Sequence, residues 1–182
     1  IYDPYRRPND PGQHPDYRDA TGPREAGFGT VEQLNYLFDR NVPAGCAPFR
    51  RMRSLTDTME DVPRFQQRGV ELILRVLAES PQRVEIVSFG SARPIAVAYN
   101  RRPELMRRKV ARVHLCAGSA PPGYMEWNVM LDPLAMVRVL QSDLPVAIYP
   151  CSTDKGAYDY GPNNTYWLMP DLQFVRRMDP RL

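Results

Sequence analysis

The sequence predicts an α/β fold with a mostly parallel sheet and helices on both of its faces. Two observations predict this class. Short, β-branched and mostly apolar segments alternate along the chain with segments of helical periodicity. The apolar segments have the composition expected of strands in a sheet that is covered on both faces. Strands separated by helices normally join as parallel neighbours through right-handed crossovers.

The first part of the chain divides into an irregular segment and the start of a domain. Residues 1–29 are expected to be irregular, because repeated prolines and glycines interrupt any periodicity. A single α/β domain is expected over residues 30–182. Its first helix is predicted to begin at Thr30, where Thr30 and Gln33 match a capping box. A short strand is expected at 42–46.

The clearest helix is predicted to begin at Pro63 and to end near residue 80. Its apolar positions follow the i, i+3, i+4, i+7 spacing of one helical face, namely Val70, Ile73, Leu74 and Leu77. A strand at 84–89 should follow, and then a helix through 95–98 and a second helical turn after Pro103.

The second half of the chain repeats this alternation. A strand is expected at 110–116. Asp132 followed by Pro133 predicts a helix start, with a capping carboxylate before a proline at the first helical position. A strand at 145–149 and a final helix at 170–177 complete the prediction. Ligand sites in such sheets lie beyond the carboxyl ends of the strands.

Charge and hydropathy exclude several function classes. The chain has 24 Lys and Arg against 21 Asp and Glu, a net charge of +3, with no basic run, so no nucleic-acid partner is expected. The sequence contains no stretch of about 18 consecutive apolar residues, so no membrane-spanning helix is predicted. Neither a signal peptide nor a start methionine opens the chain, which fits a processed or trimmed piece. The compartment stays open, with the cytoplasm slightly favoured.

Cysteine and histidine give little support to metal or triad chemistry. The three cysteines, Cys46, Cys116 and Cys151, form no C-x-x-C pair and no disulfide framework is expected from them. Each follows an apolar run, as a small buried residue at a strand end would. A redox protein that uses Cys116 and Cys151 is the least favoured alternative. His114 lies inside a predicted strand, where a structural role is usual.

The most informative polar residues follow the strand at 110–116. Glu126 and Asn128 are two residues apart, so their side chains would point the same way from an extended segment. Such a pair can bind neighbouring sugar hydroxyls, with the carboxylate accepting and the carboxamide donating. The alternative is that both residues cap the following helix and its loop.

Several segments of the chain resemble the inosine/uridine-preferring nucleoside hydrolase family. VEIVSFGSARPIAVA at 84–98 is similar to the family's strand, Gly-Pro-Leu-Thr-Asn turn and helix, and VHLCAG at 113–118 to its strand ending in Met-Gly-Gly. EWNVMLDP at 126–133 resembles the family's Glu-x-Asn-x-x-x-Asp-Pro motif. The resemblance covers about residues 29–153.

The resemblance implies hydrolysis of the N-glycosidic bond of ribonucleosides, with a small-molecule nucleoside or sugar as partner. It implies that Glu126 and Asn128 hold the ribose and that Asp132 fixes their loop. It also implies a calcium ion held by an aspartate cluster. That Asp-x-Asp-x-x-x-Asp-Asp motif is absent from this sequence, as is the family's late His-Asp pair, so the fold is expected to be incomplete.

No metal ligand or catalytic residue is therefore assigned. The acidic residues at 57, 60 and 61 lack the family's spacing, so tight calcium binding is not expected. The alternative function is a non-catalytic riboside- or sugar-binding or structural domain on the same fold. A homo-oligomer stays possible under either function.

A last candidate site lies in the aromatic, amide-rich segment 159–167. Its rings could stack on a nucleobase, and Asn163 or Asn164 could bond the edge of the base. The alternative is a packed loop against the predicted helix at 170–177.

Overall fold

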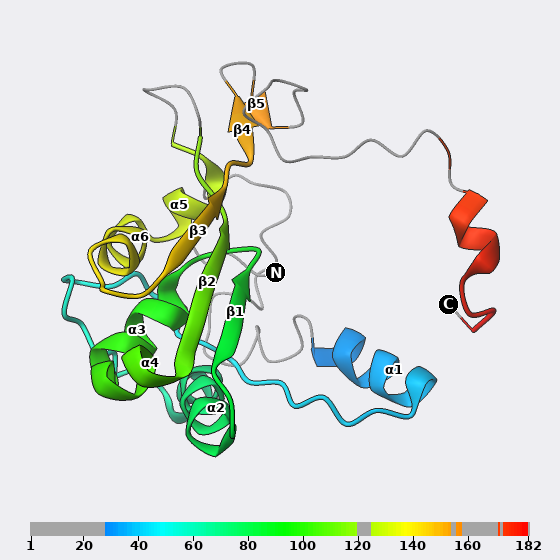
Figure 1. The fold of residues 1–182 in the computed structure, drawn as a ribbon, viewed down its shortest axis with the longest axis horizontal. Helices are drawn as coiled ribbons and strands as arrows, with labels where there is room; N and C mark the ends of the chain where they lie inside the picture. Colours follow the sequence, from blue (N-terminus) through cyan, green and yellow to red (C-terminus); the bar gives the residue numbers. More distant parts are fainter. Residues whose placement is uncertain (1–27, 120–124, 154–155, 158–170, 172, 182) are drawn as a thin grey trace.

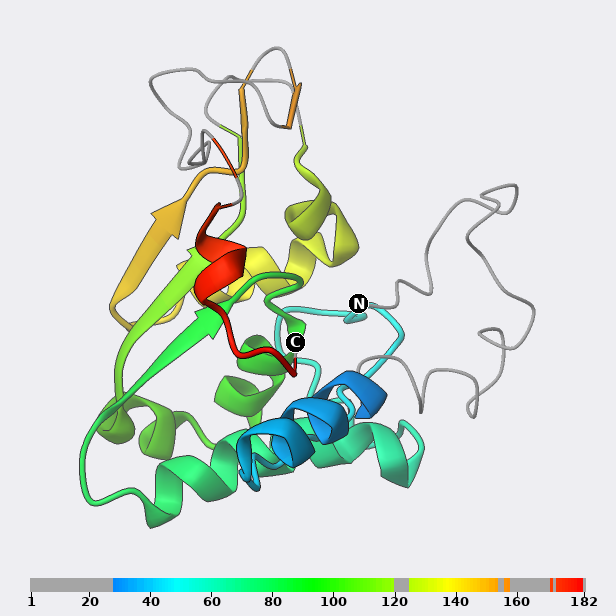
Figure 2. The same ribbon diagram turned by 90° about the vertical axis from the view of Figure 1, so that its right-hand side faces the viewer.

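The computed structural model describes residues 28–119, 125–153, 156–157, 171 and 173–181, and a parallel sheet lies at its centre (Figure 1). The strands are β1 (Val84–Ser88), β2 (Val110–Cys116) and β3 (Val146–Tyr149), in the order β1-β2-β3. Both strand pairs are parallel, and all three arrows in Figure 2 point the same way. The prediction of an α/β fold with a parallel sheet is confirmed.

Helices precede, separate and follow the strands. The elements outside the central sheet are α1 (Phe28–Phe38), α2 (Arg64–Glu79), α3 (Arg93–Arg101), α4 (Pro103–Lys109), α5 (Trp127–Leu131), α6 (Pro133–Leu140), a small antiparallel pair β4 (Ser152–Thr153) and β5 (Gly156–Ala157), and a 3₁₀ helix, η3 (Gln173–Arg177). None of the helices in the described part of the chain combines the length and apolar character needed to cross a bilayer.

Three helical elements differ from the sequence prediction. α1 begins at Phe28, so Thr30 lies inside the helix and does not cap it. The helix expected at 170–177 is the short 3₁₀ helix η3. α5 was not predicted, because its five residues are too few to show a helical period. The proposed division at residue 30 stays a prediction.

The strand predicted at 42–46 is wrong. Residues 42–46, all of which the structure describes, form no strand. They run against α2 instead, where the Cys46 carbonyl accepts a 2.6 Å hydrogen bond from Gly69 N. A backbone carbonyl that is bonded to a helix is not available to a sheet ladder. The short apolar run at this position therefore reflects contact with the start of α2.

Close backbone packing explains why both contact positions are glycines. A Cβ on Gly45 would lie 2.7 Å from the Arg68 carbonyl oxygen, and one on Gly69 would lie 2.9 Å from the carbonyl carbon of Cys46. Both distances are shorter than real Cβ contacts, and the atoms that would have to move belong to the backbone. The backbone of the 42–46 segment can therefore lie this close to α2 only because residues 45 and 69 have no side chain.

Gly69→Ala should destabilise the fold although alanine is the better helix former. The gain in helix propensity is about 1 kcal/mol, whereas overpacking against rigid backbone costs typically 1–3 kcal/mol and also disturbs the bond to Cys46. We expect a net loss of about 1–2 kcal/mol in urea unfolding. The control is Arg68→Ala, an exposed position of the same helix. Equal stability of the two variants would contradict this packing account.

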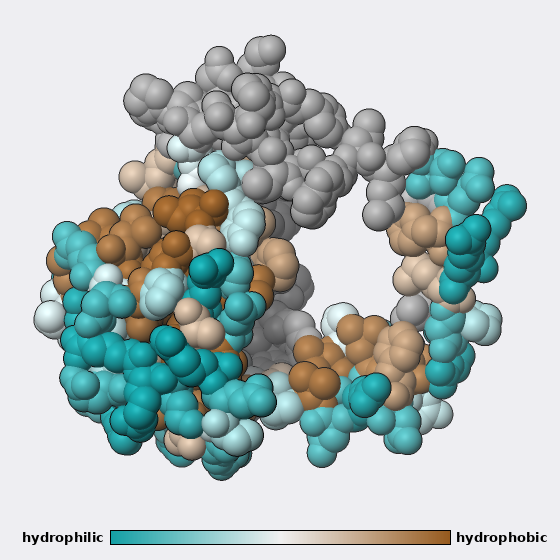
Figure 3. Space-filling model, in the orientation of Figure 1, coloured by the Kyte–Doolittle hydropathy of each residue, from teal (hydrophilic) through white to brown (hydrophobic). Residues whose placement is uncertain are grey.

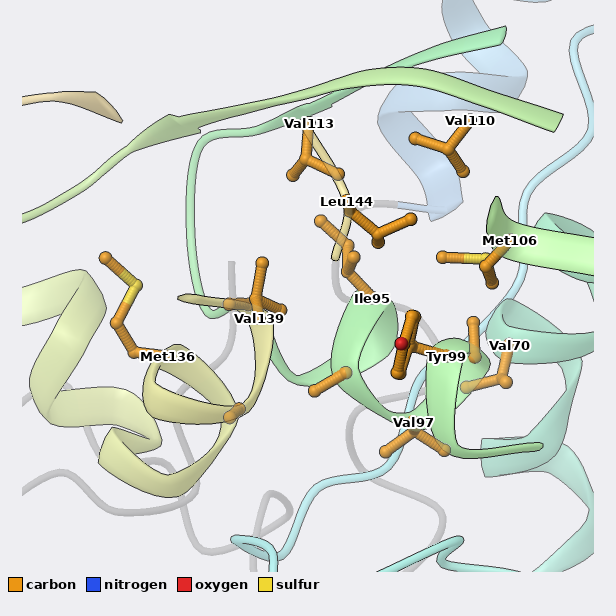
Figure 4. Close-up of a cluster of buried hydrophobic side chains, with 14 of the residues drawn as sticks. Val70, Ile95, Val97, Tyr99, Met106, Val110, Val113, Met136, Val139 and Leu144 are labelled. Atoms are coloured by element: carbon orange, nitrogen blue, oxygen red, sulfur yellow. The ribbon is translucent and has the colours of Figure 1, made fainter. Parts of the chain in front are cut away.

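The main hydrophobic core lies between one face of the sheet and a layer of helices (Figure 4). Val113 and Leu115 of β2 are fully buried and pack into one cluster with side chains from α2, α3, α4 and α6. The four positions predicted for the buried face of α2 all belong to this cluster or pack against it.

The opposite face of the sheet is more open in the described structure. Val87 and Phe89 are 57% and 71% exposed, and Tyr149 of β3 is also exposed. Apolar side chains remain exposed on α1 as well, among them Leu34 and Phe38 (Figure 3). The helices of the core cluster thus cover the face of the sheet that carries Val113 and Leu115. Helical cover of the opposite face, which the sequence also predicted, stays a prediction.

Candidate functional site

Glu126 fastens the loop that returns from β2. Its side chain is 5% exposed. One carboxylate oxygen accepts a 3.0 Å hydrogen bond from Gly118 N, two residues beyond the end of β2. The other oxygen accepts a 2.9 Å bond from Asn128 N and so caps α5. The loop leaves β2 at Gly118 with φ +95°, a conformation that suits glycine.

Asn128 joins α5 to the last residue of β2. Its Nδ2 donates a 2.7 Å hydrogen bond to the Cys116 carbonyl, and the side chain is half-buried. Among the contacts of the described residues, no hydrogen bond involves its Oδ1. One polar atom of this side chain is therefore available as an acceptor at the carboxyl end of β2, the edge of a parallel sheet at which ligands bind.

The structure thus brings Glu126 and Asn128 together at one place, but not as an extended pair. Glu126 has extended backbone angles, whereas Asn128 lies in the first turn of α5. The expectation of an extended segment was wrong because a bond from Asn128 N to Glu126 starts a helix between them. The contact of Glu126 with Asn128 N agrees with the alternative in which these residues cap the following helix. A role of either residue in binding a ligand stays a prediction.

Asp132 caps α6, as the sequence predicted, and is also half of a buried ion pair. It is 1% exposed, and its Oδ1 accepts from Ala135 N at 3.2 Å. Its Oδ2 accepts from Met52 N at 2.9 Å and from Arg93 Nε at 2.7 Å. One carboxylate therefore holds the start of α6, the 48–52 segment and the start of α3.

Arg93 is the partner that the sequence analysis missed. It is 5% exposed and donates to the carbonyls of Pro48, Phe49 and Leu131 as well as to Asp132. The available signal was an arginine directly before the apolar run PIAVA, at the first position of α3. Since a guanidinium has five donors in a fixed plane, it can join several carbonyls at once.

A second arginine secures the end of α5. Arg51 donates to the carbonyls of Met130 and Leu131 at 2.7 and 3.1 Å. Together with Arg93, it satisfies the last carbonyls of this short helix. The segment 126–131, which contains α5, is therefore held at its start by Glu126 and at its end by the two arginines.

Two of the three carboxylates at 57–61, those of Asp57 and Asp61, are engaged with arginines. Asp57 pairs with Arg50 at 2.7 Å, and Asp61 pairs with Arg53 at 2.9 Å and also contacts Arg50. Within the residues that the structure describes, no group of three His, Cys, Asp or Glu side chains could hold a metal ion. Calcium needs several oxygen ligands free of such pairing, so this donor set does not fit it.

Asp57 should make folding stability sensitive to acid. Partial burial acts to raise its pKa, but hydrogen bonds from Arg50 and from the backbone of Arg53 and Met59 hold that pKa at about 2. Because this is below the ordinary value of about 3.9, the stabilisation is present above about pH 4 and is lost as the pH falls toward about 2.

Urea unfolding at about pH 4 and about pH 2 would test this, since Asp57→Asn should lose less stability between them than the wild type. The control is Glu60→Gln, whose carboxylate takes part in no recorded ion pair of the described structure and which should keep the wild-type dependence. The same loss in wild type and Asp57→Asn would refute a role for Asp57.

The remaining candidates, Asn163 and Asn164, lie outside the described residues. Their predicted contact with a base therefore stays a prediction, as does the alternative of a packed loop.

Comparisons with known proteins identify a family for this chain. The family model for inosine-uridine preferring nucleoside hydrolases matches residues 12–168, which is most of the chain. The chain belongs to the inosine-uridine preferring nucleoside hydrolase family. The match includes every candidate residue discussed above, and it confirms the resemblance found in the sequence.

Curated relatives support this membership of the nucleoside hydrolase family. The pyrimidine-specific ribonucleoside hydrolase RihA of Enterobacter sp. (strain 638) is 39% identical over 84 residues, covering 44% of this chain and 26% of that protein. RihA of Citrobacter koseri is 39% identical over the same length, covering 44% and 27%. The chain thus matches about a quarter of the length of these relatives.

A solved nucleoside hydrolase shares the fold. The inosine-uridine preferring nucleoside hydrolase from Bacillus anthracis aligns with a TM-score of 0.54 and 15% identity. The alignment covers 70% of this chain and 52% of that one. At this identity the likeness concerns the fold alone, and it places the parallel sheet described above within a nucleoside hydrolase architecture.

Proposed function

We propose that this nucleoside hydrolase family chain binds ribonucleosides at the carboxyl end of β2 and takes part in hydrolysis of their N-glycosidic bond. The observation that carries the proposal is the place of the Glu126–Asn128 pair. Both residues lie within the segment that the family model matches. Glu126 accepts from Gly118 N just beyond β2, and Asn128 donates to the carbonyl of Cys116, the last residue of β2. Ligands of parallel sheets bind at this end of the strands.

The two side chains support this function in unequal ways. Asn128 Oδ1 takes part in no recorded hydrogen bond of the described structure and can accept from a ribose hydroxyl. Each Glu126 oxygen already accepts one backbone N–H and keeps a second lone pair. We therefore assign the direct hydroxyl contact to Asn128, with Glu126 as the residue that positions the loop and adds negative charge beside the sugar.

Negative charge at this place suits the chemistry. Cleavage of an N-glycosidic bond builds positive charge on the sugar ring, and a fixed carboxylate nearby lowers the energy of that state. Glu126 is held by two backbone N–H groups and needs no rearrangement to act in this way. The residue that activates water is not assigned to the described side chains.

A second candidate is a riboside- or sugar-binding domain without turnover. It is favoured by the engagement of the described carboxylates: Asp57 and Asp61 with arginines, and Asp132 with Arg93. These ion pairs leave none of the three aspartates in the state that a calcium ligand or a general base requires.

Base release from inosine and uridine, measured by chromatography in calcium-containing buffer, tests the proposal. We expect release above the rate without protein, and a lower rate with the matching 2′-deoxynucleosides, which lack one hydroxyl of the diol. Binding without release would favour the second candidate. A chain that neither binds the nucleosides nor releases their bases would contradict both candidates.

A further inference from the structure

Two cysteines meet where β2 and β3 end. Cys116 is the last residue of β2, and Cys151 follows β3 by two residues. Their Sγ atoms are 3.8 Å apart. An S–S bond is about 2.05 Å long, so the thiols are in contact without being joined, and about 1.8 Å of movement would join them.

The backbone around the pair is held in register. Ala117 N donates to the Tyr149 carbonyl at 3.1 Å, and Cys151 N donates to the Gly118 carbonyl at 3.0 Å. Cys116 lies opposite Tyr149 in the β2–β3 pairing, and Cys151 follows Tyr149 by two residues, so the pair sits where the paired strands end. The approach of the two sulfur atoms therefore comes from the fold and is not a chance contact of mobile loops.

We propose that Cys116 and Cys151 form a reversible intramolecular disulfide that closes the ends of β2 and β3. The oxidant is a small-molecule disulfide such as oxidised glutathione. This is a modification site distinct from riboside binding, although the Cys116 carbonyl also holds Asn128.

The reaction balances through thiol–disulfide exchange. Cys116 is half-buried and Cys151 is 5% exposed, so Cys116 is the sulfur that an incoming disulfide reaches first. The Cys116 thiolate attacks one sulfur of the small disulfide and releases one small thiol. The Cys151 thiolate then attacks the Cys116 sulfur and releases the second. The protein loses two hydrogen atoms and the small disulfide gains them.

Cys46 provides an internal control. Its Sγ contacts the carbonyl of Ala47, and burial raises the pKa of this thiol to about 11. A thiol with so high a pKa holds little thiolate near neutral pH and exchanges slowly. Under mild oxidation we therefore expect Cys46 to remain a thiol while the pair reacts.

The experiment treats the whole chain with oxidised glutathione and counts alkylatable thiols in the denatured protein by mass spectrometry. We expect a loss of two of the three thiols, a peptide that links Cys116 to Cys151, and recovery of all three on reduction. Cys46→Ser should lose the same two. Cys151→Ser should retain a glutathione adduct on Cys116, because the resolving thiol is gone.

Three outcomes would overturn the proposal. In the first, the wild type keeps all three thiols under conditions in which oxidised glutathione oxidises a small-molecule dithiol in solution. In the second, a glutathione adduct persists on Cys116 in the wild type. In the third, the recovered disulfides join Cys46 or join two chains. Circular dichroism of each variant before oxidation confirms that the comparison is made on folded protein.

Discussion

Asp132→Asn should lose about 3–5 kcal/mol of unfolding free energy, the range measured when one member of a buried ion pair is removed. Asparagine caps helices as well as aspartate does, so the loss does not come from the start of α6. It comes from Arg93, whose guanidinium would remain 5% exposed without the charge that it contacts at 2.7 Å.

A surface ion pair provides the matched control. Glu71 pairs with Arg64 on α2, where the Arg64 and Glu71 side chains are 75% and 42% exposed, so Glu71→Gln should cost less than about 1 kcal/mol. The double variant Arg93→Met, Asp132→Asn should be more stable than the sum of the single variants, since no unpaired charge is left behind. A loss of under 1 kcal/mol for Asp132→Asn in urea unfolding would show that the pair does not hold these segments.

Glu126→Ala should lose about 2–4 kcal/mol, because it leaves the N–H groups of Gly118 and Asn128 without their acceptors. Both donors are partly buried, so water replaces the carboxylate only in part. Loss of the cap on α5 is part of the same effect. Thermal and urea unfolding, followed by circular dichroism, measure the change.

Two substitutions bracket this result. Glu126→Gln keeps one carbonyl acceptor and should show a smaller loss than Glu126→Ala. Glu79→Ala removes an exposed carboxylate at the end of α2 and should stay within about 0.5 kcal/mol of the wild type. If Glu126→Ala were as stable as Glu79→Ala, Glu126 would not be the brace that its contacts describe.

Regular elements with a clear period were predictable from the sequence. Pro63 and the apolar spacing through Leu77 locate α2, and Asp132–Pro133 locates the start of α6, because caps and helical periodicity are local signals. The run at 42–46 shows the limit of this approach. It has the composition of a short strand, but its carbonyl bonds Gly69, and pattern alone cannot reveal a partner so far along the chain.

The same distinction applies to the site. The positions of Glu126 and Asn128 after a strand were sufficient to place them at its carboxyl end. Their roles as brace and cap depend on Gly118 and Cys116, contacts that no periodicity encodes. Arg93 was missed for the same reason, since the partners of a buried arginine come from segments far apart in sequence.

The affinity of uridine for Asn128→Ala, compared with wild type by calorimetry, tests the central claim most directly. If Oδ1 accepts from a ribose hydroxyl, removing it costs about 1–3 kcal/mol, so the dissociation constant should rise roughly ten- to a hundredfold. Thermal unfolding of the same samples gives the folded fraction to which the affinity refers. An unchanged dissociation constant for the folded fraction, even with a lower melting temperature, would contradict the claim and leave Asn128 as a structural link between α5 and β2.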